Sequence, residues 1–148
     1  MPSAAHLHLL INHLPVFGTA FLLLMLLYAI GKRNQSALKL NFALVVLLGL
    51  LTIPVFISGE NAEGGVKGIE GVNEEAIEPH EEFAKSSLIV MEITAGLALI
   101  GVLIGIIRKS IPFWFAVFVL LLLLATQGMM IYTSHLGGKI SHFEIMKN

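Results

Sequence analysis

Four long apolar stretches dominate the 148-residue chain and restrict its fold more than any other feature. They cover about 7–30, 37–57, 86–107 and 111–132. Each approaches the ~20 residues that a helix needs to cross a hydrocarbon core of about 30 Å. Backbone groups find no water in lipid, so a spanning segment of this kind is economical only as a helix. The sequence therefore predicts an all-α integral membrane protein with a single transmembrane domain over residues 1–148.

The composition agrees with this prediction. Apolar residues make up 56% of the chain and charged residues only 13%, whereas soluble domains contain roughly 25% charged residues. A formal net charge of −1 argues against nucleic acid as a partner. The start at Met1 has no basic segment before the first apolar stretch, so we expect this stretch to be retained as a span.

The basic residues predict the orientation. Lys32, Arg33, Lys39, Arg108 and Lys109 occupy the two short connections, after the first and third spans. Short loops rich in lysine and arginine face the cytoplasm. We therefore expect both termini and the 59–78 loop on the outer face, the periplasmic side of a bacterial inner membrane. The short connections also predict antiparallel neighbours and an up-down-up-down four-helix bundle.

Glycines mark two regions. The 59–78 segment holds five glycines among six glutamates without apolar periodicity, which predicts a mobile, acidic outer loop. Gly96, Gly101 and Gly105 in the third span either mark close approach to a neighbouring helix or are ordinary membrane-helix glycines.

All six histidines fall at the outer ends of the predicted spans. They are His6, His8, His13, His80, His135 and His142. The chain has no cysteine, which excludes disulfides, thiolate metal sites, iron–sulfur clusters and covalently attached c-type haem. The histidine placement therefore favours imidazole chemistry at one membrane face.

Their spacing suggests shared faces. His6 and His13 are seven residues apart, as are His135 and His142, and seven residues make almost two helical turns, ~10 Å along the axis. The first and fourth helices are potential neighbours, and His80 would add a ligand from the third. Pro15 predicts that the first helix kinks or begins nearby.

Haem b is the preferred cofactor, as one or two groups, because bundle cores can hold axial imidazoles and a macrocycle. The ligand candidates are His13, His80, His135 and His142, followed by His6 and His8. Gly137 and Gly138 either leave room for a flat ring or end a helix. Phe17, Phe56, Phe83, Tyr132 and Phe143 either line the slot or form an interfacial belt.

Two alternatives stay open. A divalent ion such as zinc, copper or iron would suit imidazoles, giving a sensor, transporter or metalloenzyme with a site formed by His6, His8, His13, His80 and Glu60. In the other alternative, the chain is a structural or assembly subunit whose histidines are only interfacial.

Glu92 lies within the third span, where an ionisable group is a candidate functional residue by default. It could act as a proton relay, orient a ligand histidine as an outer-shell partner, or be a neutral acid bonded to Thr94, Thr126 or Gln127.

The segments His8-Leu9-Leu10-Ile11-Asn12-His13-Leu14-Pro15-Val16 and His135-Leu136-Gly137-Gly138-Lys139-Ile140-Ser141-His142 resemble the two ends of a bacterial membrane family catalogued as domain of unknown function 2231. His80 resembles the histidine at the entry to that family's third span. The resemblance covers nearly the whole chain. It implies a four-span, histidine-bearing membrane module linked to redox proteins.

These observations favour a cytochrome-like electron-transfer protein over an enzyme, since an iron with two axial histidines has no open position. The expected partners are a periplasmic redox protein and a membrane carrier such as quinone. Because every candidate ligand lies on one side of a ~30 Å core, the cofactor alone would not carry electrons across the membrane.

Overall fold

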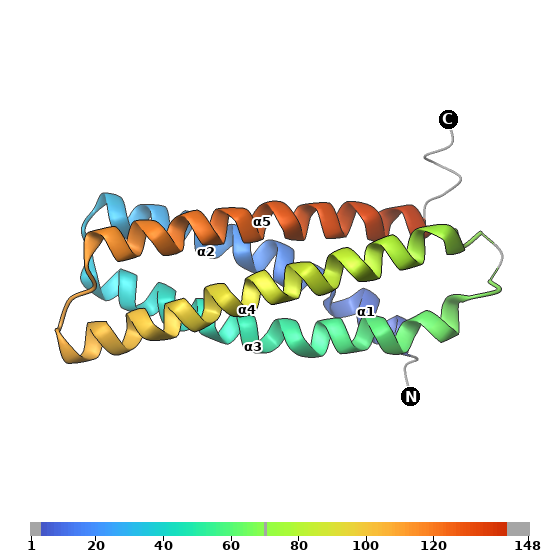
Figure 1. Ribbon diagram of the computed structural model, residues 1–148, viewed down its shortest axis with the longest axis horizontal. Coiled ribbons are helices and arrows are strands. Elements are labelled where there is room, and N and C mark those ends of the chain that lie inside the picture. Colours follow the sequence, from blue (N-terminus) through green and yellow to red (C-terminus); the bar gives the residue numbers. More distant parts are fainter. Residues whose placement is uncertain (1–3, 70, 142–148) are drawn as a thin grey trace.

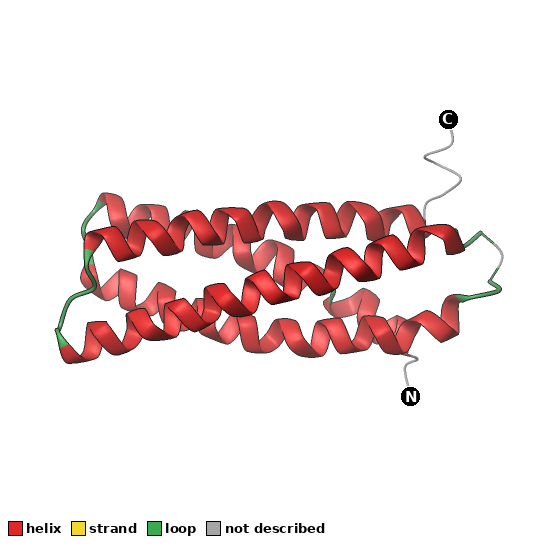
Figure 2. Ribbon diagram, in the orientation of Figure 1, coloured by secondary structure: helices red, strands yellow, loops and turns green. Residues whose placement is uncertain are grey.

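The computed structural model describes residues 4–69 and 71–141. The elements are α1 (Ala4–Ile11), α2 (His13–Gly31), α3 (Gln35–Val66), the short 3-10 helix η1 (Glu74–Ala76), α4 (Ile77–Ile107) and α5 (Phe113–Ser141). No strand occurs among the described residues, and Figure 2 shows only helices joined by short connections.

The long helices α2, α3, α4 and α5 form a four-helix bundle (Figure 1). α2 and α4 each pack against both α3 and α5, so the four helices close into a ring. The first and last helices are therefore neighbours, and the predicted all-α bundle is confirmed.

The bundle has four helical segments that are long and apolar enough to cross a membrane. Large apolar side chains also cover its outside: Leu24 and Ile106 are each 67% exposed. Soluble monomers rarely present such continuous apolar surface. These features indicate a lipid environment.

The interior combines apolar side chains with hydrogen-bonded hydroxyl groups. Phe42, Met91 and Leu123 are fully buried. Thr94 is also buried, and its Oγ1 donates to the carbonyl oxygen of Val90 at 2.8 Å and lies 3.1 Å from Oγ1 of Thr126. Bonding to a carbonyl of the same helix satisfies a buried hydroxyl at little cost.

Close helix packing explains two of the three glycines in the third span. A Cβ atom at Gly101 would overlap the Phe42 ring, and one at Gly105 would lie 3.1 Å from Cγ1 of Ile111. A Cβ atom at Gly96 would meet nothing within 4 Å. Gly101 and Gly105 therefore mark close approach, whereas Gly96 does not.

We expect Gly101→Ala to lower the free energy of unfolding by about 1 to 3 kcal/mol, because the buried Phe42 ring must move. Gly96→Ala is the matched control on the same helix and should raise stability by up to about 1 kcal/mol through helix propensity. Thermal unfolding in detergent, followed by circular dichroism, measures both changes. Equal effects at the two positions would contradict the packing described for Gly101.

The first span is interrupted. α1 ends at Ile11, Asn12 forms a turn, and α2 begins at His13, with Pro15 in its first turn. The predicted helix start near Pro15 is thus confirmed. α1 packs mainly on α3, whereas α2 contacts both α3 and α5. His6 and His13 therefore lie on different helices, and the single shared face expected from their spacing does not form.

The connection predicted over 59–78 is shorter than expected. α3 continues to Val66 and α4 begins at Ile77, so residues 59–66 are helical. Glu63 on this extension accepts a hydrogen bond from Nζ of Lys67 at 2.6 Å, an i,i+4 pair that supports a helix end in water.

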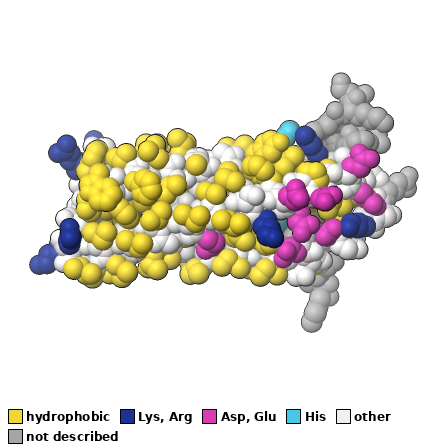
Figure 3. Space-filling view, viewed as in Figure 1, with side chains coloured by type: hydrophobic (Ala, Val, Ile, Leu, Met, Phe, Trp, Pro, Cys, Tyr) yellow, Lys and Arg dark blue, Asp and Glu magenta, His cyan; other side chains and the backbone are white. Residues whose placement is uncertain are grey.

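The acidic side chains gather at one end of the bundle. We call the end carrying His6, His8, His13, His80 and His135 the histidine end, and the end carrying Lys32, Arg33, Arg108 and Lys109 the basic end. Figure 3 shows acidic side chains gathered at the histidine end together with some basic ones, basic side chains alone at the opposite tip, and a mainly apolar band between the two ends.

Candidate cofactor site

His8 lies on α1 and is held by α3. Its Nδ1 is 3.2 Å from the carbonyl oxygen of Val55 and 3.1 Å from Oγ of Ser58, which itself donates to the Val55 carbonyl at 2.6 Å. A carbonyl oxygen only accepts hydrogen bonds, so the contact with Val55 favours the tautomer of His8 that carries the proton on Nδ1. In the neutral ring, Nε2 then keeps a free lone pair.

His80 lies near the start of α4 and is held by α5 in the same way. Its Nδ1 is 3.0 Å from the carbonyl oxygen of Thr133, so Nδ1 again donates and Nε2 is again the free nitrogen. The Thr133 hydroxyl donates to the carbonyl oxygen of Met129 at 2.9 Å and lies 2.8 Å from Oγ of Ser87. This polar contact ties α4 to α5 beside the histidine.

A glycine accommodates each imidazole. A Cβ atom at Gly59 of α3 would lie 3.0 Å from Cε1 of His8, and one at Gly137 of α5 would lie 3.0 Å from Cε1 of His80. Both distances are shorter than ordinary van der Waals contact, so a side chain at either position would push on the ring. Gly137, predicted to leave room for a flat ring, leaves room for the ring of His80.

The two half-buried rings lie at the same end of the bundle. His8 acts electrostatically on His80, so the two imidazoles are within reach of a charge–charge interaction. Four helices contribute: α1 and α4 supply the rings, and α3 and α5 supply the carbonyls and glycines that orient them. The result is a pair of oriented imidazoles, each with Nε2 available as a donor to a metal.

The other predicted ligands lie elsewhere. His13 is exposed in the first turn of α2, with its ring edge-on to Phe17 at 6.0 Å between centroids. His135 is exposed beside Tyr132, and His6 is exposed on α1. His142 falls outside the described residues.

The structure also describes Gly138 and several of the aromatic residues predicted near the site. Gly138 lies within α5, which runs to Ser141, so the Gly137-Gly138 pair does not end the helix. Phe83 packs edge-on against Tyr132, with 4.6 Å between centroids, whereas Phe17 is 70% exposed, as expected of an interfacial aromatic.

Glu92 is separate from the histidine pair. It lies twelve residues after His80 on the same helix, ~18 Å along the axis, so it does not orient that ring. Its Oε1 is buried, and the carboxyl group makes no hydrogen bond to any residue of 4–69 or 71–141. The expected bonds to Thr94, Thr126 or Gln127 are therefore not formed: Thr94 pairs with Thr126, and Gln127 accepts from Thr19.

Two imidazoles from separate helices suit a haem better than a bare metal ion. A porphyrin supplies four nitrogens, so two axial histidines complete the iron, whereas a protein zinc site needs three or four protein ligands. Within the described part of the chain, no three His, Asp or Glu side chains are arranged to hold a metal ion. The donor set of two oriented imidazoles matches what a haem iron requires from a protein.

The sequence pattern pointed to His80 and Gly137 and ranked His8 after the other candidates. It did not point to Val55, Ser58, Gly59 or Thr133. The sequence feature that could have indicated the contacts of His8 is the pair of small residues Ser58-Gly59 at the end of the second span.

Comparison of the chain with protein-family models, with curated proteins and with solved structures found no match.

Proposed function

We propose that this protein binds one haem b through Nε2 of His8 and Nε2 of His80 and transfers electrons at one face of a membrane. The observation that carries this proposal is the matched anchoring of two imidazoles, at the same end of the bundle, through Nδ1 to helix carbonyls. Histidines that bind metals commonly donate their other N–H to such acceptors, which fixes the ring and raises its basicity.

A haem bound in this way supplies reversible one-electron transfer. The protein would contribute both axial nitrogens and the apolar surroundings, and an iron with both axial positions filled favours electron transfer over catalysis. The histidine end is also the acidic end of the bundle, so a basic soluble redox protein is the favoured external partner and a quinone the favoured membrane partner.

The orientation of the protein in the membrane is part of the same proposal. The basic end would face the cytoplasm of a bacterium and the histidine end its periplasm, following the positive-inside rule. Membership of the family named above is likewise a proposal that rests on the quoted segments.

The direct test is to express the full chain with ample haem precursor and purify it in mild detergent. We expect a Soret band that shifts on reduction, with one haem b per chain by pyridine haemochrome assay. A colourless protein under these conditions would exclude the proposal. Metal analysis of that colourless protein would then separate a non-haem metal site from a structural role.

A further inference from the structure

The two turns at the basic end share an unfavourable backbone conformation. Arg33 has φ +50° and Lys109 has φ +62°, and these are the two non-glycine residues with positive φ in the described part of the chain. Each follows a helix end, where the left-handed position suits glycine because L side chains are strained there. Both turns therefore place a cation where glycine would be relaxed.

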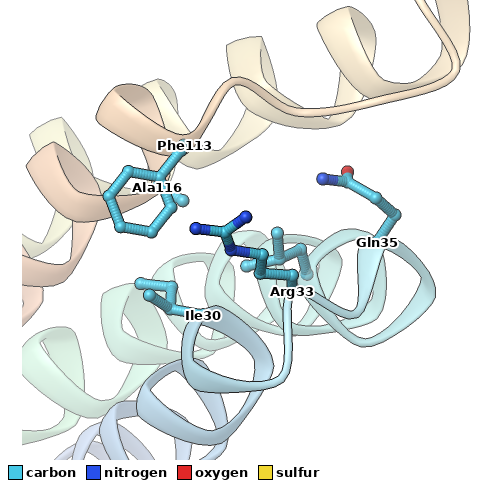
Figure 4. Close-up of a pocket in the computed structure, with 6 residues that line it drawn as sticks. Ile30, Arg33, Gln35, Phe113 and Ala116 are labelled. Carbon is cyan, nitrogen blue, oxygen red and sulfur yellow. The ribbon is translucent and has the colours of Figure 1, made fainter.

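Arg33 lies at a hollow between α2, α3 and α5. The hollow has a volume of about 320 Å³, and Ile30, Leu38, Phe113 and Ala116 form its apolar walls. Figure 4 shows the Arg33 guanidinium reaching across it toward Phe113 and Ala116. A volume of about 300 Å³ is at the lower end of the range for small-ligand sites.

The second polar residue at the hollow is already engaged. Nε2 of Gln35 donates to the carbonyl oxygen of Ile111 at 3.2 Å, and Oε1 accepts from the Ile111 amide at 2.8 Å. These two hydrogen bonds fix the start of α3 to the connection before α5. Arg33 is thus the polar group that remains to bind a ligand.

No carboxylate among the described residues neutralises this arginine. Arg33 makes no ion pair with any described residue. The one salt bridge among the described residues joins Lys67 to Glu63. The described glutamates other than Glu92 lie at the opposite end of the bundle. An unneutralised arginine beside an apolar hollow is complementary to an anion that carries hydrocarbon.

We propose that this hollow binds an anionic phospholipid, with the phosphate on the Arg33 guanidinium and the first acyl carbons on Ile30 and Phe113. The planar guanidinium matches two phosphate oxygens at once. A phospholipid fits better than a soluble anion because the walls are apolar and Phe113 is 60% exposed on the membrane-facing surface.

The test uses delipidated full-length protein in neutral detergent, with phosphatidylglycerol and phosphatidylcholine of identical acyl chains as probes. We expect phosphatidylglycerol to raise the melting temperature by several degrees and to remain bound in native mass spectrometry, and phosphatidylcholine to do neither. Arg33→Gln should weaken phosphatidylglycerol binding roughly 10-fold or more. Lys109→Gln, on the other turn, is the matched control and should keep most of the binding.

A second variant separates lipid binding from damage to the fold. Arg33→Gly removes the cation but relieves the left-handed strain, so its melting temperature in neutral detergent should equal or exceed that of the parent. Its response to phosphatidylglycerol should nevertheless be lost. Equal lipid binding by the parent and both Arg33 variants would overturn the proposal, as would equal responses to the two lipids. Saturation of the site by inorganic phosphate would overturn it in favour of a soluble anion.

Discussion

Replacing either His8 or His80 by alanine is expected to abolish the six-coordinate haem spectrum of the purified protein. Each change removes one of the two proposed ligand nitrogens and the hydrogen bond that its ring makes to the carbonyl of Val55 or Thr133. Loss of an outer-shell partner already costs a metal site roughly 10- to 100-fold in affinity, so loss of a ligand should cost more. Haem per chain and the absorption spectrum measure the effect.

The matched controls are His13→Ala and His135→Ala. Both histidines are exposed at the same end of the bundle, beside Phe17 and Tyr132 respectively. We expect each control to keep the parent haem content and spectrum. If instead the controls lose haem and the variants of His8 and His80 retain it, the ligand assignment is wrong even though the protein binds haem.

The second large effect is expected when a bulky side chain enters either glycine position beside the rings. In Gly137→Leu the new side chain would begin 3.0 Å from Cε1 of His80, and in Gly59→Leu it would begin 3.0 Å from Cε1 of His8. Both positions are helical, so leucine should strengthen the helix itself by up to about 1 kcal/mol. We therefore expect haem binding to fall about 10-fold or more while helical content is retained.

Each glycine has a control on its own helix. A Cβ atom at Gly128 of α5 or at Gly64 of α3 would meet nothing within 4 Å, so Gly128→Leu and Gly64→Leu should bind haem normally. Far-ultraviolet circular dichroism verifies folding, and haem titration gives the affinity. Unchanged haem affinity in both Gly59→Leu and Gly137→Leu would show that these glycines are not needed to position the two imidazoles for haem binding.

The architecture was accessible from the sequence because it depends on segment length and hydropathy. Four apolar stretches joined by short connections leave few arrangements other than an antiparallel bundle, and the protein has that arrangement. The clustering of the histidines at one end followed from the same topology.

The ranking of the candidate ligands was less accessible, because the seven-residue spacing of His6 and His13 has meaning only within one continuous helix. The turn at Asn12 separates His8 from His13: α1 packs on α3 and carries His8 to Val55, while His13 stays exposed on α2. A one-residue break in helical continuity cannot be located from periodicity alone.

The groups that orient the two rings could not be predicted from the sequence for a different reason. The atoms that orient His8 and His80 are mainly the main-chain oxygens of Val55 and Thr133. Every residue carries a carbonyl, so residue type does not distinguish the ones that accept from a side chain. Only the packing of α1 on α3 and of α4 on α5 selects them.

The most direct test of the two-histidine assignment is near-infrared magnetic circular dichroism of the ferric protein, together with electron paramagnetic resonance. These spectra identify the axial ligands of a haem iron. We predict a single low-spin haem with two imidazole ligands, lost in both His8→Ala and His80→Ala. A high-spin iron, a methionine–histidine pair, or a low-spin signal that survives both substitutions would contradict the assignment.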